Sequence, residues 1–168
     1  GLAAVGLFAS GAWHTLAQTT APERMGPRKI ARYARDAGQD SSIVGDGKAA
    51  YLGIGARALP VAVLLDPART WAPLRLARAE AGDAASHLIA LLYQEPQAVV
   101  LFGDGPALSG DEAAPRTVRA VSATLVQTLQ LAGFEPVPDS HRYLGRTAVA
   151  VFSRHRPSDP RSIRPQLA

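Results

Sequence analysis

The chain has 168 residues, of which 47% are hydrophobic and 19% are charged. This length is sufficient for one domain with a substantial core, and the composition argues against intrinsic disorder. The formal net charge is +4, but the basic residues are spread over every segment without a stripe of interleaved aromatic residues. We therefore expect no nucleic-acid partner. Because the chain has no cysteine, it can form no disulfide and no thiolate metal site.

The first 21 residues contain no Asp, Glu, Lys or Arg. They combine Leu, Val, Phe and Trp with many Gly and Ala residues, and they are long enough to form the end of a transmembrane helix. The small residues make this segment only weakly hydrophobic, so a buried or amphipathic helix of a soluble protein is the alternative. The sequence leaves both interpretations open.

Residues 27–154 show the pattern of an α/β domain. Apolar residues at helical spacing alternate with short aliphatic runs, of which LPVAVLL at 59–65 is the clearest in the first half. In this half we expect a helix at 27–38, a strand at 41–44 that ends in Gly45-Asp46-Gly47, a short helix at 48–57 and a strand at 59–65.

The second half continues the alternation of helices and strands. The apolar run at 98–102 predicts a buried strand, and apolar residues at i, i+3, i+4 and i+7 predict a helix at 114–132. The other elements expected here are a helix at 74–93, a short strand at 134–137, a terminal strand at 146–154 and a Pro/Arg-rich tail at 155–168.

This order of elements predicts a three-layer α/β fold. We expect a mostly parallel open sheet of about four or five strands with helices on both faces. Only a few residues separate the last two strands, so they are expected to form an antiparallel hairpin at the C-terminal edge of the sheet.

Two Gly-Asp-Gly tripeptides each follow an expected strand directly, at 45–47 and at 103–105. Ligands of open α/β sheets bind at the carboxyl ends of strands, where glycine permits close approach and Asp can hold a metal ion or a hydroxyl group. The candidate ligand-binding residues are therefore Asp46, Gly47, Tyr51, Asp104 and Gly105. The alternative is that glycine serves the geometry of each turn and Asp caps the next helix, with no ligand bound.

Familiar cofactor motifs are absent around these turns. A thiamine-diphosphate site pairs Gly-Asp-Gly with a downstream asparagine, and the chain has no Asn. The phosphate-loop pattern is missing, and Gly53-Ile54-Gly55 lacks the third glycine of a dinucleotide fingerprint. The four histidines have no i, i+4 spacing, and no carboxylate pair stands out as an acid/base couple. We predict no cofactor, no metal site and no catalytic residue in this segment.

The order of several short segments resembles the soluble C-terminal domain of multi-pass GT-C-type membrane glycosyltransferases, which use polyprenyl-phosphate sugars. The segments that carry this resemblance are IARYA at 30–34, SIVGD at 42–46, YLG at 51–53, GARALP at 55–60, QEPQAVV at 94–100, LAGFEPV at 131–137 and VAVFSR at 149–154.

The resemblance implies an accessory domain on the extracytoplasmic face of a membrane. It would follow transmembrane helices of the same chain and lie close to a lipid-linked sugar or an acceptor. In that family the catalytic acidic residue lies in loops between early transmembrane helices, which this segment does not contain, so no catalytic residue is transferred to it. From the residues alone, two alternatives remain: a free-standing α/β ligand-binding domain or enzyme that uses the Gly-Asp-Gly turns, and a non-catalytic interaction domain.

Overall fold

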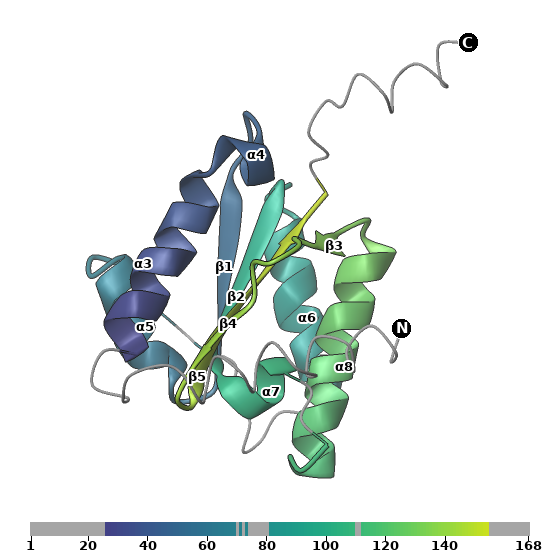
Figure 1. The fold of residues 1–168 in the computed structure, drawn as a ribbon. Coiled ribbons are helices and arrows are strands. Elements are labelled where there is room, and N and C mark those ends of the chain that lie inside the picture. Colours follow the sequence, from purple (N-terminus) through teal and green to yellow (C-terminus); the bar gives the residue numbers. More distant parts are fainter. Residues whose placement is uncertain (1–25, 70, 72, 74–80, 110–111, 155–168) are drawn as a thin grey trace.

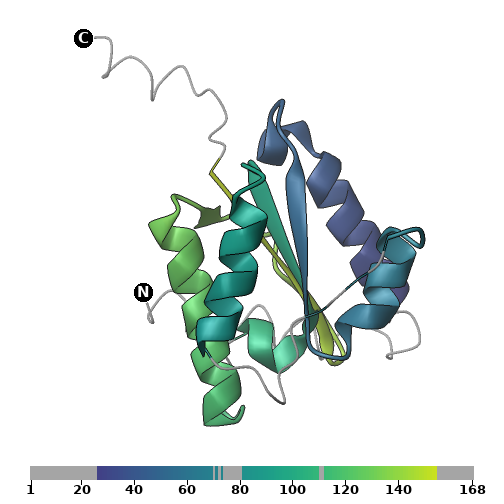
Figure 2. The same cartoon turned by 180° about the vertical axis from the view of Figure 1, so that it is seen from behind.

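A computed structural model of the chain describes residues 26–69, 71, 73, 81–109 and 112–154. Over these residues a sheet lies between two layers of helices (Figures 1 and 2). The helices are α3 (Gly26–Gln39), α4 (Ser41–Val44), α5 (Ala58–Leu65), α6 (Ala81–Leu92), α7 (Gly105–Ser109) and α8 (Arg116–Leu131). The strands are β1 (Ala49–Ile54), β2 (Ala98–Asp104), β3 (Glu135–Pro136), β4 (Arg142–Leu144) and β5 (Thr147–Ser153).

The five described strands form one mixed sheet in the order β1-β2-β5-β3, and β4 also pairs with β5. The expected α/β class, with helices on both faces of an open sheet, is confirmed. Parallel pairing is confined to β1 and β2, whereas β5 runs antiparallel to β2, β3 and β4. The sheet is therefore less parallel than the sequence suggested, because short connections deliver β5 in the reverse direction.

The two strands expected to pair near the C-terminus are β3 and β5, and they are antiparallel as predicted. An additional strand that the sequence did not predict, β4, lies between them in sequence and also pairs with β5. Gly145 and Arg146 join β4 and β5, with Leu144 opposite Thr147, and Gly145 adopts a φ of 62°. A positive φ is common at such short hairpin turns. The strand β3 pairs with the other end of β5, so β3 and β4 both border β5 on the side opposite β2.

Three expected elements in the first half are wrong. Residues 41–44 form the helix α4, because the Asp40 carboxylate accepts a hydrogen bond from the Ser42 backbone N–H (2.9 Å) and so caps a helix. The strand β1 occupies most of the range expected to be helical at 48–57, where Gly53 and Gly55 disfavour a helix. Conversely, the range 59–65 forms α5, since an uninterrupted apolar run does not distinguish a strand from a buried helix.

Alternate residues of the central strands face two separate hydrophobic clusters. From β2, Val99 and Leu101 pack with α6, α7 and α8, whereas Val100 and Phe102 pack with α3 and α5. The same alternation continues on β5. Because successive side chains of a strand point to opposite faces, two apolar faces require two helical layers.

The apolar segment at 1–21 and the tail at 155–168 lie outside the described residues, as does the first part of the helix expected at 74–93. Within the described part of the chain, no helix combines the length and the apolar character needed to cross a membrane.

Candidate functional site

The two Gly-Asp-Gly turns lie at opposite ends of the sheet. Residues 45–47 precede β1, whereas residues 103–105 end β2, and these two strands are parallel with Ala49 opposite Ala98 and Ile54 opposite Gly103. One strand length, about 20 Å, therefore separates the turns. Asp46 and Asp104 therefore do not line one crevice, because the strand of the first turn follows the tripeptide instead of preceding it.

The second turn, residues 103–105, makes close contacts with neighbouring elements. One carboxylate oxygen of Asp104 lies 2.7 Å from Nη1 of Arg57, and the other accepts a hydrogen bond from the backbone N–H of Ala107 (3.0 Å). Gly103 has a φ of 129°, and a Cβ there would collide with the carbonyl oxygen of Ile54. A Cβ on Gly105 would collide with the ring of Tyr143. Asp104 thus joins the β1–α5 connection to the start of α7, as in the interpretation of the motif as turn chemistry.

The first turn is exposed. The Asp46 side chain lies at the surface, and the Gly47 backbone N–H donates to the carbonyl oxygen of Val44 (2.9 Å). A Cβ on Gly47 would collide with the Gln97 side chain, so this glycine is required for close packing beside the start of β2. Neither residue lines the groove described next.

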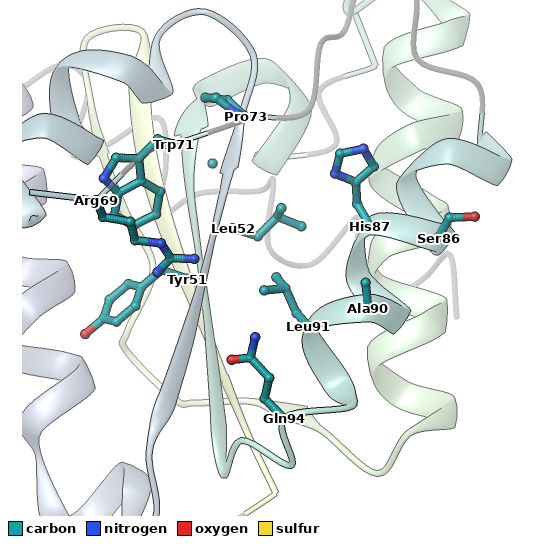
Figure 3. Close-up of a pocket in the computed structure, with 11 residues that line it drawn as sticks. Tyr51, Leu52, Arg69, Trp71, Pro73, Ser86, His87, Ala90, Leu91 and Gln94 are labelled. Atoms are coloured by element: carbon teal, nitrogen blue, oxygen red, sulfur yellow. The ribbon is translucent and has the colours of Figure 1, made fainter.

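Tyr51 borders a groove of about 450 Å³ that runs beside β1 (Figure 3). Within the described part of the sheet, β1 pairs only with β2 and forms the outer edge. Tyr51, Leu52 and Gly53 line the groove from this edge. Of the five candidate ligand-binding residues, Tyr51 is therefore the one that the structure brings to an open site.

The helix α6 supplies one wall of the groove. The residues that line this wall recur at intervals of about one helical turn: Ser86 and His87, Ala90 and Leu91, and Gln94 just beyond the helix. His87 and Gln94 are both exposed and can donate and accept hydrogen bonds. Their spacing on one helical face is visible in the sequence, but the sequence does not show which strand this face meets.

The opposite wall is formed by Trp71 and Arg69, with Pro73 at one end. The Arg69 guanidinium lies 4.2 Å from the centre of the Trp71 ring, and Trp71 Nε1 donates to the carbonyl oxygen of Asp66 (3.1 Å). The indole also meets the Phe102 ring edge-on at 5.7 Å. These contacts hold the aromatic ring in place at the side of the groove.

The hydroxyl of Tyr51 lies against α3, where a Cβ on Gly38 would collide with it. Burial raises the pKa of this phenol, and the nearby positive charge of Arg35 opposes the rise only in part. Tyr51 is therefore protonated at neutral pH, and it contributes its ring, not a base, to the edge of the groove.

The described lining of the groove has the composition of a binding site. It combines an aromatic wall, an apolar floor and a few hydrogen-bonding groups, which is the common composition of a small-molecule site. No group of three or more metal-ligating side chains occurs within the described ranges. Among the residues that line the groove, His87 is the sole histidine, and no carboxylate accompanies it.

A second histidine, His141, packs inside the fold and lies outside the groove. The His141 ring meets the Phe152 ring edge-on at 6.0 Å, and burial, assisted by the positive charge of Arg142, lowers its pKa to about 4. Nearby, the Ser140 hydroxyl donates to the carbonyl oxygen of Val137 (2.6 Å). This cluster thus stabilises the β3–β4 connection with a neutral imidazole.

No protein-family model matches the chain, and no curated protein or solved structure is significantly similar to it. The resemblance to GT-C-type glycosyltransferase domains therefore stays a prediction.

The different environments of the two turn aspartates predict different effects on stability. Asp104→Ala is expected to lower the free energy of unfolding by about 2 kcal/mol, because it leaves Arg57 without its partner and an α7 amide without its acceptor. Asp46→Ala, the matched control in the exposed turn, should change it by less than about 0.5 kcal/mol. Urea unfolding followed by circular dichroism measures both values, and equal effects would contradict the assigned roles.

The buried imidazole predicts a loss of stability in acid. The unfolded chain takes up the proton near the ordinary pKa of 6.5, whereas folded His141 does so only near pH 4. Lowering the pH between these values therefore favours the unfolded state, by up to about 3 kcal/mol.

His141→Gln should remove this component, seen as a shallower fall of the free energy of unfolding between pH 6.5 and pH 4. The measured quantity is the slope of the free energy of unfolding against pH. A substitution that changes stability equally at every pH does not alter this slope. The control His87→Gln changes an exposed residue and should keep the original slope. If His141→Gln keeps the slope of the parent chain, His141 is not the source of the loss of stability in acid.

Proposed function

We propose that this domain binds a sugar-bearing ligand in the groove beside β1, as the extracytoplasmic accessory domain of a membrane glycosyltransferase. That enzyme would transfer a sugar from a lipid-phosphate donor with catalytic residues outside this segment. The observation that carries the proposal is the pairing of the Trp71–Arg69 wall with the polar face of α6 across an open volume of about 450 Å³.

The two walls offer the two kinds of contact that a sugar ring requires. The C–H face of a sugar ring is apolar and packs on aromatic or aliphatic side chains, here Trp71 and Leu91. The hydroxyl groups require donors and acceptors, which His87 and Gln94 supply from the other side (Figure 3). The groove volume lies within the range of small-molecule sites.

Arg69 adds a positive charge to one wall of the groove. Its guanidinium is held over the Trp71 ring and carries several N–H donors in one plane. Such a group suits a phosphate attached to the sugar. This feature favours a glycosyl phosphate over a neutral sugar, in agreement with a lipid-linked donor.

The groove can be tested by titration with soluble probes. We expect methyl glycosides of common hexoses to bind weakly, and the corresponding hexose 1-phosphates to bind more tightly, in isothermal titration calorimetry. Gln94→Ala and His87→Ala should each weaken binding about five- to ten-fold, because each removes one hydrogen bond worth about 1 kcal/mol. Both positions are exposed, so neither variant should change the free energy of unfolding.

Arg119→Ala on α8 is the matched control, since it removes an exposed polar side chain away from the groove. Its affinity should equal that of the parent chain. If none of the probes binds, or if the control loses affinity as the groove variants do, the groove is not a sugar site.

The second part of the proposal concerns the gene. We expect the reading frame to encode several transmembrane spans upstream of Gly1, because the related enzymes hold their catalytic acid between such spans. Sequencing the gene upstream of this segment provides the measurement. A reading frame without those spans would contradict the glycosyltransferase assignment, whereas the titration would still decide whether the groove binds sugars.

A further inference from the structure

The outer surface of α5 is apolar and exposed. All eight residues of this helix are aliphatic or proline, and Leu59 and Val63 are 46% and 55% exposed. Pro60 and Leu64 are exposed beside them. A helix that is apolar on every side is normally buried on every side, so the exposed half of α5 is a candidate contact surface.

A stripe of arginines runs along α3 beside this apolar surface. Arg28, Arg32 and Arg35 are exposed and recur at i, i+4 and i+7, which places them on one side of the helix. This side faces α5, because the Arg35 guanidinium donates a hydrogen bond to the carbonyl oxygen of Leu64. Both helices cover the same face of the sheet (Figures 1 and 2).

We propose that this α3/α5 face rests on a membrane surface that contains anionic lipid. In this arrangement Leu59, Val63 and Leu64 enter the boundary between headgroups and acyl chains, and the arginine stripe contacts the lipid phosphates. Apolar side chains beside a basic margin are the combination by which helices bind in the plane of a membrane interface. Long arginine side chains can cover apolar surface while their charged ends reach the phosphates.

The charges of the surface favour an anionic occupant. Lys29 and Asp36 are the other exposed charged residues of α3, so this helix has a net charge of +3. A hollow of about 300 Å³ lies where α3 and α5 begin, and Arg57 and Arg146 are among its lining residues. Arg57 also forms an ion pair with Asp104. The hollow offers space for a lipid headgroup at the end of the apolar strip.

The composition of the strip favours lipid over a protein partner. The cores of protein interfaces are enriched in aromatic residues and contain hydrogen-bonding groups, whereas α5 presents aliphatic side chains alone. The chain also reaches α3 from a segment of 21 uncharged residues, with only Pro22–Met25 between them in sequence. The inference does not depend on sugar binding, since no residue that lines the groove belongs to α3 or α5.

The absence of cysteine allows a site-specific test on the whole chain. Val63→Cys, labelled with an environment-sensitive fluorophore, is mixed with phosphatidylcholine vesicles that contain or lack phosphatidylglycerol. We expect a blue shift of the emission with the anionic vesicles and little change with phosphatidylcholine alone. Leu131→Cys is the matched control, because Leu131 is 82% exposed at the end of α8 in the other helical layer.

Charge reversal tests the arginine stripe in the same assay. Arg28→Glu combined with Arg32→Glu in the labelled chain should weaken binding to the anionic vesicles at least ten-fold. Arg116→Glu combined with Arg119→Glu on α8 should leave binding unchanged. Because residues 1–21 are identical in all of these proteins, a difference between the two pairs reports on the α3/α5 face. Circular dichroism verifies that each variant is folded.

Three results would overturn the proposal. One is an unchanged emission at position 63 with anionic vesicles, and another is an equal blue shift at positions 63 and 131, which indicates unspecific adsorption. The third is a blue shift at position 63 with natural membranes that contain protein but not with pure lipid vesicles, which would identify a protein as the partner.

Discussion

The burial of β2 is the constraint on which the rest of the domain depends. Residues 98–103 of this strand are fully enclosed, so their backbone groups must be paired on both sides, with β1 and with β5. Both faces of β2 are apolar, and each requires a layer of helices. This pairing also determines where the groove lies. The strand β1 forms hydrogen bonds with β2 on one side, so its other side is the outer edge of the described sheet and borders the groove.

The same tripeptide has different roles in its two positions because one copy precedes a strand and the other ends one. At 103–105 it ends β2 and begins α7, and its aspartate joins Arg57 to the start of α7. At 45–47 it precedes β1, and its aspartate reaches the surface. Identical local sequence therefore does not indicate identical function, and neither turn lines the groove. The side chains that could contact a ligand in the groove are instead Trp71, Arg69 and the polar residues of α6.

The sequence predicts the elements whose patterns have a single interpretation. The apolar run of β2, the stripe of α8 and the short spacing before β5 each determine an element, and they suffice for the α/β class. The prediction is wrong at α5, because every position is apolar and the sequence has no helical periodicity there. It is also wrong at β1, because the Ala and Gly residues of this strand have a low strand propensity. The groove was also beyond prediction, because only the tertiary structure brings Trp71 and Gln94 to the same groove. Of the candidate residues, Tyr51 alone lines it.

The groove and the α3/α5 face are joined through the end of α5. The carbonyl oxygen of Leu64 accepts a hydrogen bond from Arg35 of the basic stripe, and two residues later the carbonyl oxygen of Asp66 holds the indole of Trp71. The Asp66 carboxylate also accepts a hydrogen bond from the Ala68 backbone N–H, which fixes the turn between them. A surface that orients α5 therefore also orients the aromatic wall of the groove. In the proposed arrangement the sugar site has a defined height above the lipid phosphates, as recognition of a sugar on a lipid anchor requires.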